Sequence, residues 1–172
     1  MNGDRIALST VVSALIVLVV STFLAGIVTM YARNITWIRS QQEKLRLTGQ
    51  NMWVYSDGSA FAAFSIENIG GKDVIIDKIE VRGVEAEWST VYYLRRATAL
   101  SYSLICPRST YWFDFEYADG IFGTFTQASG DLPLASGDTM IIYIVDPGNI
   151  RVSDIGKSVG ITVFTSNSQL QC

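Results

Sequence analysis

The sequence predicts an α+β protein, in which one long apolar α-helix at the N-terminus is followed by an all-β sandwich head. Two observations predict this arrangement. No charged residue occurs from Ile6 to Ala32, a run of 27 positions. From about residue 51 onward, apolar residues instead recur at every second position between turns rich in glycine and aspartate. With 172 residues, the chain is long enough for one domain and an appendage, but short for two ordinary domains.

The composition argues against several classes of function. Histidine is absent, which removes the commonest general base and the commonest metal ligand. The net charge is −3 and no basic cluster is present, so the electrostatic pattern of a nucleic-acid-binding protein is missing. The two cysteines, Cys106 and Cys172, are too few and too far apart for a zinc motif. We therefore expect no enzyme activity, no cofactor, no metal site and no nucleic-acid partner.

The N-terminal run predicts a helix that is surrounded by lipid or by other protein. At about 1.5 Å per residue it would be roughly 40 Å long, more than the ~30 Å hydrocarbon core of a bilayer. It has no polar face, and small residues such as Ser13, Ala14 and Gly26 would allow close helix packing. We expect the helix to continue through the charged residues beyond it and to end at Gly49, which gives a helix over residues 8–48 and a head over 50–172.

Three interpretations of this helix remain open. A secretory signal has an apolar core of only about 7–15 residues, so this run is longer than expected for one. A permanent transmembrane anchor fits the length. A prepilin-type segment fits as well, with a short leader, residues 1–7, removed in front of a helix that is kept. Basic residues, among them Arg33 and Lys44, follow the apolar run, and by the positive-inside rule they favour a cytoplasmic head, whereas the head itself has features of an exported domain.

The segment MNGDRIALSTVVSALIVLVV resembles the start of archaeal type IV pilins and archaellins. The resemblance implies that a prepilin peptidase cuts between Ala7 and Leu8. It also implies that the helix is first a membrane anchor and then the core of a helical homopolymer. The expected polymer-core positions are Val12, Leu15, Ile16, Val19, Phe23 and Ile27.

The head is expected to consist of short strands. Asp57-Gly58, Asp119-Gly120 and Asp146-Pro147-Gly148 are turn signals that separate apolar segments. The expected strands are 52–55, 60–66, 74–81, 90–94, 99–106, 111–117, 121–126, 140–145 and 159–165. Eight or nine strands in about 120 residues predict a single sandwich or barrel.

The head also resembles the immunoglobulin-like heads of crenarchaeal pilin subunits, through FSIENIGGKDVIIDKIEVRG (64–83), STVYYL (89–94) and the stretch from Gly137 to Thr165. The resemblance implies a structural subunit of an extracellular type IV pilus on the cell surface, used for adhesion. The implied partners are the prepilin peptidase, an assembly ATPase and a platform membrane protein, together with the surfaces, cells or viruses that the filament meets. Two alternatives stay open: an archaellin of a motility filament, and a membrane-anchored β-sandwich binding protein.

Several other residues are candidate sites in the head and helix. Cys106 and Cys172 can pair in only one way. A disulfide between them would stabilise the head by roughly 4 kcal/mol through loop closure, although two separate thiols are an equal alternative. Asn34 begins the N-glycosylation sequon Asn34-Ile35-Thr36, which lies on the helix. The aromatic stretch at 111–117 is expected to be mostly sandwich core, with outward-facing rings available as subunit or receptor contacts. Asp114 and Glu116 alternate with these rings and are expected on a solvated strand face.

Overall fold

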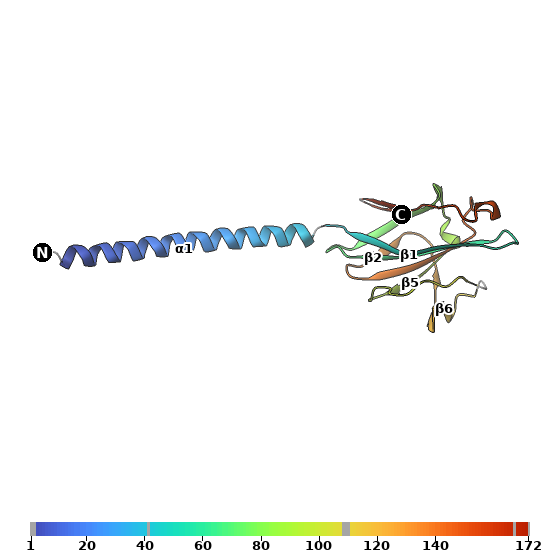
Figure 1. The fold of residues 1–172 in the computed structure, drawn as a ribbon, viewed down its shortest axis with the longest axis horizontal. Helices are drawn as coiled ribbons and strands as arrows, with labels where there is room; N and C mark the ends of the chain where they lie inside the picture. The colour runs from blue at the N-terminus through green and yellow to red at the C-terminus, as the bar shows by residue number, and fades with distance from the viewer. Residues whose placement is uncertain (1–2, 41, 108–110, 167, 172) are drawn as a thin grey trace. The chain divides into compact units, whose positions relative to one another are not determined.

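The computed structural model describes residues 3–40, 42–107, 111–166 and 168–171. It confirms the α+β class: one apolar helix, α1 (Gly3–Ser40), is followed by a mostly β head with antiparallel sheets (Figure 1). The chain divides into two compact units, Met1–Gln41 and Gln42–Cys172.

Helix α1 ends at Ser40, so the predicted helix over 8–48 is wrong at its C-terminal end. Strand β1 (Leu45–Val54) begins where the helix was expected to continue. Leu45 and Leu47 alternate with polar residues and pack against the core of the head, because they pair with the second strand, for example Leu47 with Ile66. Gly49 has φ +64°, but it lies at a bulge in β1, where the register shifts between Thr48 and Asn51, and does not cap a helix. The head therefore begins at residue 42 rather than 50.

Two five-stranded antiparallel sheets form most of the head. The first sheet has the order β1, β2 (Ala60–Asn68), β10 (Thr139–Val145), β5 (Val91–Arg96) and β8 (Thr126–Gln127). The second has the order β12 (Gln169–Gln171), β11 (Ile161–Thr165), β3 (Val74–Val81) and β4 (Val84–Glu85), with β9 (Leu132–Leu134) also paired to β3. A separate hairpin joins β6 (Phe115–Ala118) to β7 (Ile121–Gly123), and single-turn 3-10 helices span Trp88–Thr90 and Val152–Asp154.

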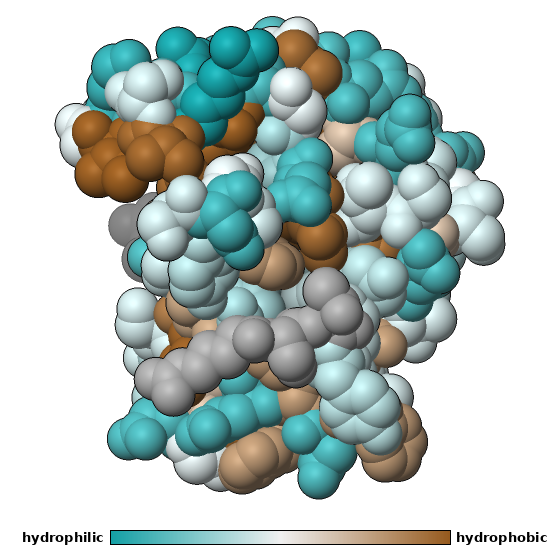
Figure 2. All heavy atoms as spheres, turned by 90° about the vertical axis from the view of Figure 1, so that its right-hand side faces the viewer, coloured by the Kyte–Doolittle hydropathy of each residue, from teal (hydrophilic) through white to brown (hydrophobic). Residues whose placement is uncertain are grey.

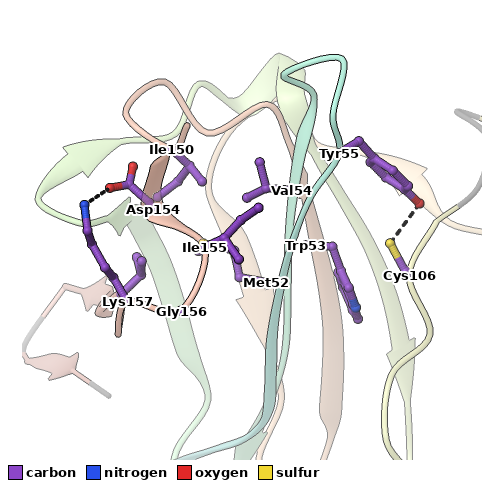
Figure 3. Close-up of a pocket in the computed structure, with 11 residues that line it drawn as sticks. Met52, Trp53, Val54, Tyr55, Cys106, Ile150, Asp154, Ile155, Gly156 and Lys157 are labelled. Carbon is purple, nitrogen blue, oxygen red and sulfur yellow. Dashed lines mark hydrogen bonds and ion pairs between the residues drawn. The ribbon is translucent and has the colours of Figure 1, made fainter. Parts of the chain in front are cut away.

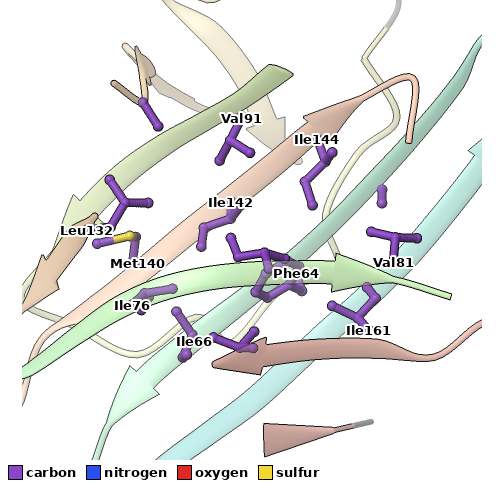
Figure 4. Packing of buried hydrophobic residues seen from close by; sticks show 14 of the residues in the cluster. Phe64, Ile66, Ile76, Val81, Val91, Leu132, Met140, Ile142, Ile144 and Ile161 are labelled. Atoms are coloured by element: carbon purple, nitrogen blue, oxygen red, sulfur yellow. The ribbon is translucent and has the colours of Figure 1, made fainter. Parts of the chain in front are cut away.

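The main hydrophobic core lies between the two sheets (Figure 4). Fully buried aliphatic and aromatic side chains come from both: Phe64, Ile66, Met140 and Ile142 from the first sheet, and Ile76, Ile79, Ile161 and Val163 from the second. Side chains on alternate positions fill this layer, as expected for a sandwich, except in β3, where an irregularity in the register with β11 separates Ile76 and Ile79 by three positions. The predicted bounds of the strand at 74–81 are confirmed, and those at 60–66 and 140–145 differ by no more than two residues at either end.

A second hydrophobic cluster covers the opposite face of the first sheet. Ala63, Ile141 and Tyr143 point away from the main core and are covered by residues between 100 and 125. The Tyr143 hydroxyl donates to the Ile105 carbonyl at 2.9 Å, and burial raises the pKa of this phenol. The Trp112 ring stacks on Tyr92 with 4.5 Å between ring centroids. Strands β2 and β10 are therefore buried on both faces.

This covering layer is why the strand predictions at 99–106 and 111–117 are wrong. Residues 99–106 cross the sheet without joining a ladder, and within 111–117 only Phe115, Glu116 and Tyr117 lie in a strand. The expected strand at 121–126 is divided between β7 and β8. The apolar residues of these segments that are buried, such as Leu104, Trp112 and Phe125, pack across the sheet face rather than alternating within a strand. The short strands β4, β9 and β12 have no matching prediction, because two or three residues carry too little periodicity.

Candidate functional site: the apolar helix

The six positions predicted to form a polymer core all lie on the surface of helix α1. Their exposed fractions range from 40% at Val19 to 69% at Phe23, and Ile16, Val12, Leu15 and Ile27 lie between these values. Their spacing places them on one face of the helix. The side of the helix away from them is also apolar, and it carries the smaller residues Ala14, Ser21, Ala25 and Ala32.

The helix is apolar on every side within the part whose side chains are described, Ser9–Trp37. Large apolar residues outside the predicted face are as exposed as those on it, for example Val17 and Leu18 at 64% each. This 29-residue stretch is long and apolar enough to cross a membrane, a test that a signal sequence near an N-terminus also passes. A helix of this kind is stable only when lipid or other protein surrounds it.

Five hydroxyl groups of the helix donate hydrogen bonds to carbonyls of the helix itself. Ser13, Ser21, Thr29 and Thr36 each donate to the carbonyl four residues earlier, at 2.7–2.9 Å, and Thr22 donates to the carbonyl of Val19 at 2.8 Å. An unsatisfied hydroxyl in an apolar medium is costly, so these bonds remove the main polar penalty of burying the helix.

The remaining predicted residues have different outcomes. Ala7 and Leu8 lie in the helical backbone of α1, and nothing in the structure tests a cut between them. Asn34 is exposed on the same helix, and the Thr36 hydroxyl of its sequon donates to the carbonyl of Ala32. Cys172 lies outside the described residues, so its pairing with Cys106 stays a prediction.

A cavity of about 500 Å³ lies in the head beside the C-terminal end of β1 (Figure 3). Met52 and Val54 point to one side of the strand, toward Ile150 and Ile155, while Trp53 and Tyr55 point to the other (Figure 3). Its polar groups bind one another: the Tyr55 hydroxyl lies 3.0 Å from the Cys106 sulfur, and Lys157 pairs with Asp154. Sequence reasoning missed this cavity, because its walls come from three distant segments that no spacing rule connects.

Asp154 lies in the wall of the cavity opposite β1, and its ion pair with Arg82 connects this wall to the second sheet. Its carboxylate accepts hydrogen bonds from the Lys157 ammonium at 3.0 Å, the Arg82 guanidinium at 2.9 Å and the Arg151 backbone N–H at 3.1 Å. The hydrogen bond from Lys157, together with that from Arg82, holds the pKa of Asp154 below its usual value. These contacts fix the loop that follows β10.

The chain matches no family model, and no curated protein shows significant similarity to it. The helix and the head must therefore be interpreted from their own chemistry.

Proposed function

We propose that this chain is a structural pilin subunit, which polymerises through its N-terminal helix into an extracellular type IV pilus filament used for surface adhesion. One observation carries the proposal: helix α1 exposes apolar side chains on every side over Ser9–Trp37. A helix that leaves the membrane with such a surface needs an equally apolar environment, and a bundle of identical helices provides one.

The energetics favour this assembly. Complete burial of a Val, Leu, Ile or Phe side chain contributes about 1.5–3 kcal/mol relative to water. Many such side chains on one helix can therefore outweigh the loss of freedom on association, which costs on the order of 4–15 kcal/mol. The internal hydrogen bonds of Ser13, Ser21 and Thr29 let the same surface pass from lipid to protein without exposing an unpaired donor. A head-to-tail contact between staggered subunits does not close on itself and produces a helical filament.

The resemblance to archaeal type IV pilins supplies the expected partners: a prepilin peptidase, an assembly ATPase and a platform membrane protein. In this proposal the precursor is membrane-inserted, and the β heads form the surface of the filament that meets other surfaces, cells or viruses.

The intact mass of the native protein tests the proposal. A pilin subunit is expected to lack residues 1–7 and to appear in filaments by electron microscopy. A permanently anchored binding protein keeps these residues and forms no filament, and that result would refute the proposal. An archaellin would also be cut and polymerised, but loss of the gene would then abolish swimming rather than attachment.

A charge within the helix tests the polymer core. Ile16→Asp places a carboxylate at a position that is 55% exposed in the single chain but buried in the proposed bundle. A charge at the centre of an apolar span costs about 2.5–3.5 kcal/mol by insertion scales, and the cost recurs in every subunit. We expect loss of filaments. The matched control is Ile155→Asp, which introduces the same charge at an exposed head position and should assemble normally. Equal filament yield from the two variants would contradict a polymer core in the helix.

A further inference from the structure

One ribbon of the layer that covers the first sheet packs its inner side chains against that sheet. This ribbon, residues 111–125, contains the β6–β7 hairpin, and beyond it the Phe125 N–H donates to the Trp112 carbonyl at 2.8 Å. Phe115 and Phe125 meet Tyr143 of β10 with ring centroids 5.4 and 5.3 Å apart. Gly123 lies so close to the sheet that an added Cβ would stand 2.7 Å from a Leu94 methyl carbon. The ribbon is therefore anchored by its inner side chains.

The outer face of the same ribbon presents aromatic rings to solvent. Tyr111 and Phe113, on either side of the buried Trp112, are 66% and 62% exposed, and Phe122 is 55% exposed. The Tyr111 and Phe113 rings form an edge contact with centroids 6.3 Å apart. In Figure 2, apolar and hydrophilic residues adjoin each other along the lower edge of the head, the side on which Figure 1 places β6. Exposed aromatic rings held on a rigid ribbon are typical of contact surfaces.

Carboxylates surround these rings, and no cation of this segment balances them. Glu116 stands directly opposite Phe122 in the hairpin, and Asp114 and Asp119 are exposed. From Tyr111 to Ile150 the sequence contains no lysine or arginine, but it contains these three acids and three further aspartates. The ribbon thus has a negative charge as well as an aromatic surface.

We propose that this outer face, formed by Tyr111, Phe113, Asp114, Glu116 and Phe122, docks a protein surface rich in lysine or arginine. Aromatic faces attract cations through their quadrupole, and carboxylates add charge-assisted hydrogen bonds to the same groups. Charge complementarity selects this partner: a neutral sugar chain would stack on the rings and donate hydrogen bonds to the carboxylates but would gain no charge attraction, and a nucleic acid or an anionic lipid would be repelled. The proposal rests on the head alone and does not depend on polymerisation.

The test measures binding of a fluorescently labelled octalysine peptide to the full-length chain in a neutral detergent, by fluorescence anisotropy. Phe113→Ala removes one ring, and we expect binding to weaken about two- to fivefold. Asp114→Asn removes one charge and should weaken binding to a similar extent. Asparagine tolerates the left-handed backbone at this position, where φ is +50°. Binding should also weaken at high ionic strength, because the contact is exposed and screened by salt.

Two matched controls separate a docking face from general acidity. Ile155→Ala removes an exposed apolar side chain outside the ribbon, and Glu85→Gln removes an exposed charge outside it. Both should bind octalysine as the wild type does. The proposal is overturned if Glu85→Gln weakens binding as much as Asp114→Asn, because net charge alone would then explain it. It is also overturned if Phe113→Ala has no effect, or if a neutral octaserine peptide binds equally well.

Discussion

Replacing Gly70 with alanine should push the loop that contains it away from residues 42–44, where the head begins. A Cβ at Gly70 would lie 2.5 Å from the Gln42 carbonyl oxygen and 2.6 Å from the Lys44 nitrogen, whereas ordinary contacts begin at 3.4 Å. Both neighbours are backbone atoms, so no side chain can rotate away. The loop carrying Gly70 is itself fixed by the buried Asn68, whose amide donates to the Lys72 and Leu134 carbonyls at 2.8 and 3.2 Å.

The energetic cost follows from the hydrogen bonds that cross the same gap. Ile69 N–H donates to the Lys44 carbonyl at 2.8 Å, and Gly71 N–H donates to the Gln42 carbonyl at 3.3 Å. Moving the strands apart weakens both bonds, at about 0.5–1.5 kcal/mol each, and overpacking adds about 1–3 kcal/mol. Because the two bonds are weakened rather than lost, we expect Gly70→Ala to lower the free energy of unfolding of the head by about 2–4 kcal/mol, the lower part of the summed range. For a unit of this size, that corresponds to a fall in Tm of about 10 °C.

The measurement is thermal unfolding of the full chain in neutral detergent, followed by near-UV circular dichroism. The matched control is Gly130→Ala, because a Cβ there meets nothing within 4 Å and the position has no positive φ. It should change stability by less than about 1 kcal/mol, in the stabilising direction if at all. If Gly70→Ala unfolds at the same temperature as Gly130→Ala, the close packing of residues 42–44 against this loop is refuted.

Two further predictions concern the cavity and its surroundings. Asp154→Asn removes the partner of Lys157 and Arg82, so the variant should unfold at a lower temperature than the wild type at neutral pH. The pKa of Asp154 is lowered in the folded state, so its ion pairs stabilise the head above the ordinary pKa near 3.8, and this stabilisation is lost as the pH falls through the folded-state pKa. The difference in Tm between the wild type and Asp154→Asn should therefore shrink in acid. A constant difference in Tm from pH 7 to pH 3 would contradict the ion-pair role. Non-reducing peptide mapping should find one crosslink between Cys106 and Cys172, the two cysteines of the chain. Two thiols titrated under denaturing conditions without reductant would exclude this bond.

The sequence predicted the parts of the fold in which the pattern is local. In Val74–Val81 the polar residues Asp77, Lys78 and Glu80 interrupt a run of aliphatic residues, as expected of a strand with one solvated face, so both ends of β3 could be placed correctly. The helix end could not, because the charged residues after Ala32 are compatible with a helix and Gly49 could have capped it, and only the pairing of Leu45 and Leu47 with β2 selects the extended form. Tertiary contacts of this kind override local propensity.

The layer over the first sheet was difficult to predict for a related reason. The aromatic run at 111–117 has the composition of a core strand, yet the order of its inward and outward rings changes at Asp114, where φ is +50°. Trp112 lies before this residue and Phe115 after it, and both reach the same sheet. No rule of spacing predicts such a break. A clue was present in β10, whose continuous apolar run Met140–Val145 indicates a strand covered on both faces.

Within the part of the chain that the structure describes, the hydrophobic core of the head contains no residue of helix α1, so the polymer proposal makes a prediction about the stability of the head. Both hydrophobic clusters of the head draw their buried members from residues 60–163, and the partly buried residues packed against them begin at Leu45. Helix α1 contributes to neither cluster within the described residues, so the stability of the head should not depend on the helix surface. A helix variant that abolishes filaments, such as Ile16→Asp, should therefore leave the unfolding temperature of the head unchanged. Loss of filaments together with a lower Tm would mean that the variant acts through folding. Loss of filaments at an unchanged Tm, with the variant still present in the membrane fraction, assigns the defect to association, because folding and membrane insertion are then both intact.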